Sequence, residues 1–251
     1  MNPIFEPATL VVIGGIFVLA GMVKGTTGIG LPTAAVGMMS QFMDPRQAIA
    51  LVVFPSLLSN AWQMFRQGRV GAVLARFWLF IACLMGFIAL VSFTVTASVP
   101  TETLIVILGC VICLFSVMSL AFSPPVLPAR YDRAGQVISG TASGVLGGLT
   151  GIWAPPMVTY LMARRIEKEE FVAATGVMIF AGTLPLIGGF WSAGLLSGNL
   201  AMVSVMMFMP ALIGFTLGET LRHRMDADRF RTVVLVVFLV MGLNLFRKAL
   251  F

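Results

Sequence analysis

Long apolar runs separated by short polar segments dominate the hydropathy pattern of this chain. Six of the runs have close to the length that an α-helix needs to cross the hydrocarbon core of a bilayer, about 20 residues. The pattern therefore predicts six ordinary transmembrane helices. They cover residues 45–65, 75–97, 103–122, 170–191, 197–219 and 231–250.

Two further apolar stretches, residues 7–43 and 134–163, are interrupted by glycines followed by proline. The first interruption reads KGTTGIGLP at 24–32, and the second reads GLTGIWAPP at 148–156. A continuous helix over 7–43 would be about 55 Å long, well beyond the ~30 Å hydrocarbon core. Each stretch is therefore predicted to be a broken helix, which either crosses the membrane or turns back as a re-entrant hairpin.

The two interruptions match each other at an offset of 123 residues, without a gap. This match predicts an internal repeat within a single transport domain over 1–251. We expect residues 1–122 to form the first repeat, 123–133 the linker and 134–251 the second repeat. The matching pairs are Gly21–Gly144, Gly25–Gly148, Thr27–Thr150, Gly28–Gly151, Ile29–Ile152 and Pro32–Pro155.

Composition agrees with a polytopic membrane protein, since 59% of the residues are hydrophobic and only 10% are charged. The net charge of +6 comes from small clusters of Lys and Arg between the apolar runs. The sequence has no long basic tail and no basic patch interleaved with aromatic residues, so nucleic-acid binding is not expected.

The distribution of the cations decides between crossing and re-entrant segments. Lys24, which lies within a break, is set aside. If all eight segments cross, seven of the other cations lie on one side of the membrane and eight on the other. If both broken segments are re-entrant, twelve lie on one side and three on the other. The positive-inside rule favours the uneven division. The twelve predicted to be cytoplasmic are Arg66, Arg69, Arg76, Arg130, Arg133, Arg164, Arg165, Lys168, Arg222, Arg224, Arg229 and Arg231, and the other three are Arg46, Arg247 and Lys248.

Each half then holds one hairpin and three transmembrane helices, an odd number, so the halves have opposite orientations. The predicted fold is an all-α polytopic membrane protein with two inverted repeats, an architecture of secondary transporters. Both termini are expected on the non-cytoplasmic side.

The broken segments carry the candidate binding site. Unwound backbone persists in a membrane only against protein or a wet cavity. Pro32 and Pro155 fit the first turn of a returning half-helix, whose free N–H groups and positive dipole end favour an anion. Two such ends facing each other near the midplane would form an anion site, with threonine hydroxyls as further donors. The candidate substrate-binding residues are Lys24, Gly25, Thr26, Thr27, Gly28, Gly30, Asn60, Gly148, Leu149, Thr150, Gly151 and Trp153. The alternative is that the glycines only let helices pack closely.

Three of these candidates have a specific alternative role. Lys24 is a basic residue far from any loop cluster, and it either serves function or extends its ammonium to a lipid headgroup. Asn60 either faces the cavity or bonds a neighbouring helix. Trp153 replaces Gly30 of the first motif, and it either shapes the cavity or plugs it.

Other residue types narrow the chemistry. No Asp or Glu lies in the middle of a predicted span, and Glu219 comes nearest. A cation or proton antiporter normally needs a buried acid, so an anion is favoured. His223 is interpreted as a solvated loop residue. Cys83, Cys110 and Cys113 are interpreted as packing residues. We find no catalytic or metal-binding constellation and expect neither enzymatic activity nor a cofactor.

The segments GMVKGTTGIGLPTAAVG and GVLGGLTGIWAPPMVTYL resemble the twin glycine–proline motifs of the TauE/SafE sulfite exporter family. The closing segment LIGFTLGETLRHRMDADRFRTVVLVVFLVMGLNLF is similar to the last helix pair of that family. In the second motif, Trp153 and Ala154 stand where the family often has further glycines. By position, the motif residues are Gly25, Thr27, Gly28, Pro32, Gly148, Thr150, Gly151 and Pro155.

The resemblance implies a multi-pass transporter of the bacterial inner membrane. Such a protein would export sulfite, organosulfonates or related sulfur oxyanions by alternating access. The expected partners are a small anionic substrate and the lipid bilayer, and the protein is either a monomer or a homodimer. Two alternatives stay open: an ion-coupled importer of another small anion, such as a carboxylate or a thiosulfate-like compound, and a membrane scaffold without transport.

Overall fold

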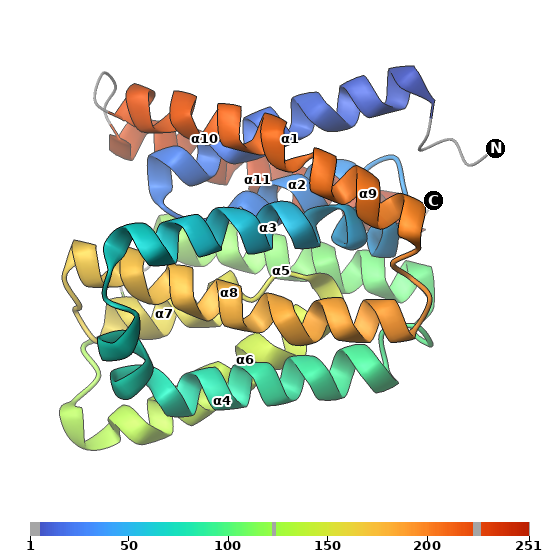
Figure 1. Ribbon diagram of the computed structural model, residues 1–251. Helices are drawn as coiled ribbons and strands as arrows, with labels where there is room; N and C mark the ends of the chain where they lie inside the picture. The colour runs from blue at the N-terminus through green and yellow to red at the C-terminus, as the bar shows by residue number, and fades with distance from the viewer. Residues whose placement is uncertain (1–5, 122–123, 223–226, 251) are drawn as a thin grey trace.

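The computed structural model describes residues 6–121, 124–222 and 227–250, and helices make up nearly all of them (Figure 1). The described residues contain no strand, which confirms the all-α fold. The helices are α1 (Pro7–Thr27), α2 (Leu31–Met39), α3 (Pro45–Gln67), α4 (Val70–Thr94), α5 (Thr101–Ala121), α6 (Asp132–Thr150), α7 (Ala154–Ala163), α8 (Lys168–Ser192), α9 (Gly198–Met206), α10 (Phe208–Arg222) and α11 (Ala227–Leu250), with a 3₁₀ turn, η2, over Ala129–Tyr131.

Seven segments of the described chain are long and apolar enough to cross a membrane, and the protein is a multi-pass membrane protein. Six of them coincide with the predicted spans, with α9 and α10 together forming one of the six. The seventh is α1, the first arm of the first broken stretch.

Both predicted breaks are present, and in both a glycine with a left-handed φ precedes a helix that has proline in its first turn. α1 ends before Gly28, which adopts a left-handed φ of 83°, and α2 starts with Pro32 in its first turn. α6 ends before Gly151, with a φ of 67°, and α7 starts with Pro155 in its first turn. Glycine adopts these φ values without a steric penalty, and proline fits a first turn because no partner is needed for its missing N–H.

The two arms of each hairpin differ in length. α1 and α6 have 21 and 19 residues, whereas α2 and α7 have 9 and 10. At about 1.5 Å per residue, each long arm spans most of the hydrocarbon core and only the returning arm is a half-helix.

Contacts between loops show where each hairpin begins and ends. Arg46 donates to the carbonyl oxygens of Thr96 and Val99, and Lys248 donates to that of Ser40. The start of α3, the α4–α5 loop, the end of α2 and the end of α11 therefore share one face, which we call the terminal face. The start of α1 lies on the same side in Figure 1. The first hairpin thus starts and ends at the terminal face.

The second hairpin starts and ends at the opposite face. Arg164 donates to the carbonyl oxygen of Leu127 at 2.8 Å, which joins the end of α7 to the segment before α6. Ion pairs Arg66–Glu219 and Arg76–Glu170 join the α3–α4 region to the end of α10 and the start of α8. We call this side the basic face.

Both broken stretches are therefore hairpins, as the cation distribution predicts. The symmetry of inverted repeats, the division into 1–122, 123–133 and 134–251, and the side of the membrane on which each face lies stay predictions. The side chains of Arg222, Arg229 and Arg231 lie outside the described part of the chain, and so do Ser123, His223 and Arg224.

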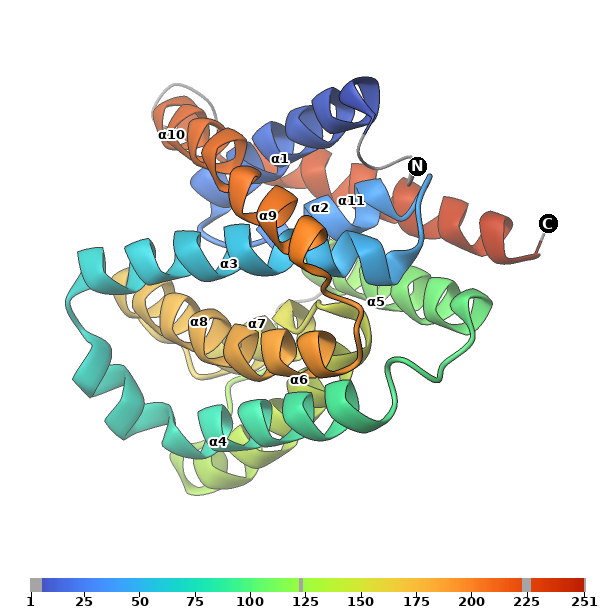
Figure 2. The ribbon, with the colours of Figure 1, turned by 45° about the vertical axis from the view of Figure 1, so that its right-hand side comes forward.

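The long arm of each hairpin packs against a helix from the other half of the chain, α1 against α10 and α6 against α4. Glycines make both contacts close: a Cβ at Gly21 would collide with the carbonyl oxygen of Ala211, and one at Gly214 with that of Val18. A Cβ at Gly140 would lie 2.7 Å from the carbonyl oxygen of Phe80. Figure 2 shows α3 and α8 between the α1–α10 pair and the α4–α6 pair.

Candidate functional site

Lys24 lies on the last turn of α1, and its side chain points into the protein. It is 1% exposed, and its Nζ donates to Asn60 Oδ1 at 2.7 Å and to Ser59 Oγ at 3.0 Å. The ammonium therefore binds α3 and does not extend to the membrane surface. Asn60, in turn, bonds the neighbouring helix through this lysine.

A stripe of buried polar side chains on α3 receives the lysine. Ser56, Ser59, Asn60 and Gln63 follow the i, i+3, i+4, i+7 spacing of one helix face. Asn60 Nδ2 donates to the carbonyl oxygen of Ser56 at 2.7 Å, which leaves its Oδ1 directed at Lys24. Gln63 Nε2 donates to the carbonyl oxygen of Val172 at 2.8 Å and so ties α3 to α8.

Within the described part of the chain, no carboxylate forms an ion pair with Lys24. The ion pairs of the described residues join Arg46 to Asp44, Arg66 to Glu219, Arg76 to Glu170 and Arg164 to Asp132. The two hydrogen-bond partners of Lys24 are neutral oxygens. A buried ion is costly unless an opposite charge accompanies it, so an anion in contact with Lys24 would stabilise the charged form of this lysine.

Lys24 borders a cavity of about 210 Å³ between α1, α3, α8 and α10, which we call the polar cavity. Gly25, Gly28 and Gln63 line it too. At the basic face it is bordered by the ion pair Arg66–Glu219, with 3.1 Å between Nη1 and Oε1, and by Lys168 and Glu169.

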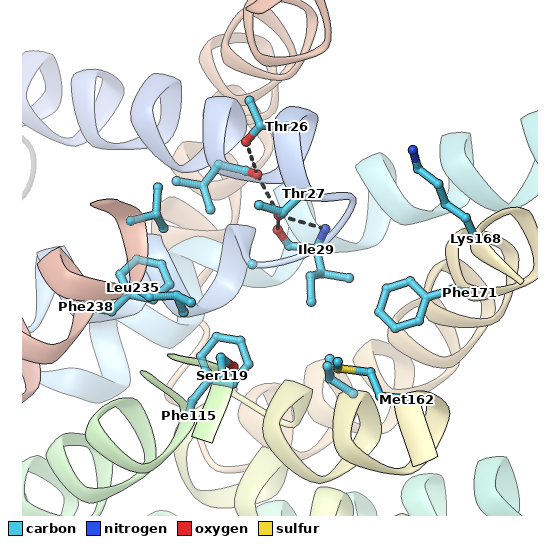
Figure 3. Close-up of a pocket in the computed structure, with 14 residues that line it drawn as sticks. Thr26, Thr27, Ile29, Phe115, Ser119, Met162, Lys168, Phe171, Leu235 and Phe238 are labelled. Carbon is cyan, nitrogen blue, oxygen red and sulfur yellow. Dashed lines mark hydrogen bonds between the residues drawn. The ribbon is translucent and has the colours of Figure 1, made fainter. Parts of the chain in front are cut away.

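A second cavity, of about 350 Å³, lies on the other side of the α1–α2 turn (Figure 3). Thr26, Thr27, Ile29 and Gly30 form one wall of this aromatic cavity. The remaining walls are mostly apolar and include Phe115, Phe171 and Phe238. Lys168 borders both cavities.

The motif threonines hold their own turns. Thr27 Oγ1 lies 2.8 Å from the carbonyl oxygen of Val23 and 2.7 Å from that of Ile29, and it accepts from the Ile29 N–H at 3.4 Å. Thr150 repeats the pattern: its Oγ1 lies 2.7 Å from the Leu146 carbonyl oxygen and accepts from the Ile152 N–H at 3.2 Å. Thr26 likewise donates within its own turn. In this conformation the single hydroxyl hydrogen of each threonine is used locally.

The second motif is packed tightly. Trp153 is 3% exposed, a Cβ at Gly151 would lie 3.0 Å from Ile49 Cγ2, and one at Gly148 would lie 2.6 Å from Val91 Cβ. The space bordered by Gly151, Trp153 and Pro32 measures only about 10 Å³, room for one water molecule at most and too little for a substrate anion. Trp153 therefore fills this region in the present conformation.

The structure thus divides the candidate residues into two groups. The first group lies at or beside the two cavities and consists of Lys24, Gly25, Thr26, Thr27, Gly28, Gly30 and Asn60. The second group, Gly148, Leu149, Thr150, Gly151 and Trp153, lines neither of them. Pro155 borders a smaller apolar cavity next to α5.

Sequence reasoning missed most of the residues around the polar cavity and Lys24, among them Ser59, Gln63, Arg66, Lys168 and Glu219. Ser59 and Gln63 could have been found, because they share the helical spacing of Asn60. Arg66, Lys168 and Glu219 look like ordinary charges at helix ends, and only the tertiary fold brings them to one cavity.

The comparison with protein families agrees with the motifs. The family model described as sulfite exporter TauE/SafE matches residues 13–245, nearly the whole chain. Searches of curated proteins and of solved structures found no match. The family that the glycine–proline motifs indicate is therefore confirmed. The chain belongs to the TauE/SafE sulfite exporter family, a family of membrane transporters.

Proposed function

We propose that the protein exports small sulfur oxyanions, such as sulfite or an organosulfonate, through a site at Lys24. The observation that carries this proposal is the buried Lys24 ammonium, which borders a cavity and whose partners among the described residues are neutral oxygens. An anion in the polar cavity would supply the missing negative charge. Arg66 and Lys168, at the basic face, would attract it to the entrance.

The direction of flux follows from the charges. The positive-inside rule puts the basic face in the cytoplasm of a bacterial inner membrane. Both cavities are bordered by Lys168 of this face, which supports an entrance for the anion from the cytoplasm. An inside-negative membrane drives an anion outward by about 2.3 kcal/mol per charge per 100 mV. Export therefore needs no coupled ion.

Alternating access would use the two closely packed helix pairs as moving bodies. The α1–α10 and α4–α6 pairs are each held by glycine contacts with backbone, which supports movement of each pair as a unit. Rocking of one pair against the other, as in inverted-repeat transporters, would close the basic face. It would also open the closed space around Trp153 toward the terminal face.

Flux into liposomes tests the proposal. Purified protein should carry sulfite or a small sulfonate faster than protein-free vesicles, and the rate should follow the membrane potential. A panel of sulfur oxyanions and carboxylates with no accelerated flux would overturn it. Flux that collapses with a pH or sodium gradient would instead support an ion-coupled importer.

A further inference from the structure

Glu219 is a carboxylate that borders the cavity in which the anion is proposed to bind. It lies near the end of α10, and its side chain is 38% exposed. Its Oε1 pairs with Arg66 of α3 at 3.1 Å, and both residues line the polar cavity together with Lys24. The charged side chains of the described residues that line this cavity are therefore three cations, Lys24, Arg66 and Lys168, and two carboxylates, Glu169 and Glu219.

A glycine brings Glu219 close to the turn that carries Lys24. A Cβ at Gly25 would lie 2.9 Å from the backbone nitrogen of Glu219 and 3.0 Å from Gly218 Cα. A Cβ at Gly218 would in turn collide with the carbonyl oxygen of Met22. α10 and the end of α1 are thus in backbone contact at this level.

Two polar links join this α1–α10 pair to α3. One is the bond from Lys24 to Asn60 and Ser59, and the other is the ion pair of Arg66 with Glu219. Both links border or adjoin the polar cavity. An anion that binds both Lys24 and Arg66 would compete with both links at once, because each link depends on one of these two cations.

We propose that Glu219 acts as a built-in competitor of the transported anion and that its ion pair with Arg66 is a gate. The entering anion displaces the carboxylate from Arg66, and this releases the α1–α10 pair from α3. When the anion leaves, Glu219 pairs with Arg66 again and restores the link between the α1–α10 pair and α3. The inference rests on the proposed anion site at Lys24 and assigns to that site the element that couples occupancy to movement.

Neutralising Glu219 should therefore tighten anion binding. Glu219→Gln removes the competing charge but keeps the size of the side chain. Because the pair is largely exposed, the expected gain is modest, about twofold to fivefold in the affinity for sulfite. A carboxylate with a purely structural role would give the opposite result, since its loss would loosen the site and weaken binding.

The chain offers a matched control. Glu170 forms an ion pair with Arg76 on the same face, at 2.6 Å, and it does not line the polar cavity. Glu170→Gln should leave the affinity for sulfite unchanged. The exchanged variant Arg66→Glu with Glu219→Arg keeps a pair across α3 and α10, so its affinity should return toward that of the unmodified protein.

Titration calorimetry with sulfite on the purified full-length protein provides the measurement. A gain in affinity in Glu219→Gln alone supports the gate. An unchanged or weaker affinity in Glu219→Gln, or an equal gain in Glu170→Gln, overturns it. If sulfite flux is present but Glu219→Gln behaves like Glu170→Gln, only the gate fails. If no sulfur oxyanion binds or crosses at all, the anion site itself fails.

Discussion

Trp153 packs its ring against Gly147, the residue that corresponds to Lys24 in the repeat, and a Cβ at Gly147 would lie 2.7 Å from the ring Cε3. The second hairpin thus packs the indole of Trp153 beside the position at which the first hairpin carries a lysine. The site is consequently asymmetric, with its charge in the first hairpin and its bulk in the second.

This contact predicts that even a methyl side chain at position 147 would destabilise the protein. Gly147→Ala would force the methyl group into the Trp153 ring, and we expect a loss of about 1–3 kcal/mol in the free energy of unfolding. Thermal unfolding in detergent measures it. Gly86→Ala is the control, because a Cβ there meets no atom within 4 Å. Equal melting temperatures for the two variants would show that the indole is not held against α6.

Asn60 offers a test of the charge at Lys24 that keeps the shape of the site. Asn60→Asp puts a carboxylate where Oδ1 now lies, 2.7 Å from the ammonium. The new ion pair would compete with a substrate anion, so we expect binding of sulfite to weaken by about tenfold or more while the protein stays folded. Calorimetric titration gives the affinity. Unchanged binding in Asn60→Asp would separate Lys24 from the substrate.

The repeated threonine bonds predict a similar structural role in both motifs but a different functional effect. Thr27→Val and Thr150→Val should each lower stability by about 1–2 kcal/mol, because each leaves a turn N–H or carbonyl without its hydroxyl partner. Only Thr27→Val should also slow transport, since only the first turn borders the two cavities. Thr27→Ser and Thr150→Ser keep the hydroxyl and serve as controls. Equal transport defects in both Val variants would contradict this assignment.

Much of the fold could be predicted because it depends on local rules. Helix length and hydropathy set the spans, and the glycine–proline pattern set the breaks at Gly28 and Gly151. The division of cations predicted that both broken segments turn back. The unequal arms of the hairpins were not predicted, because glycine positions mark a break but not the depth at which it lies.

Less of the candidate site could be predicted from the sequence, because the site depends on tertiary contacts. Lys24 was found from its isolation in an apolar stretch, but its bonds to α3 depend on how α1 and α3 pack. The convergence of Arg66, Lys168 and Glu219 comes from three different helix ends. Trp153 had two possible roles in the sequence, and its burial against Gly147 shows that it fills space in this conformation.

The central claim is that the buried Lys24 ammonium binds the transported anion. Sulfite flux in liposomes should be compared among the unmodified protein, Lys24→Met and Lys24→Arg, with Arg69→Gln, at an exposed position on the basic face, as the control. We expect Lys24→Met to abolish flux, Lys24→Arg to retain part of it and Arg69→Gln to retain nearly all of it. Flux through Lys24→Met equal to that through the unmodified protein would contradict the account.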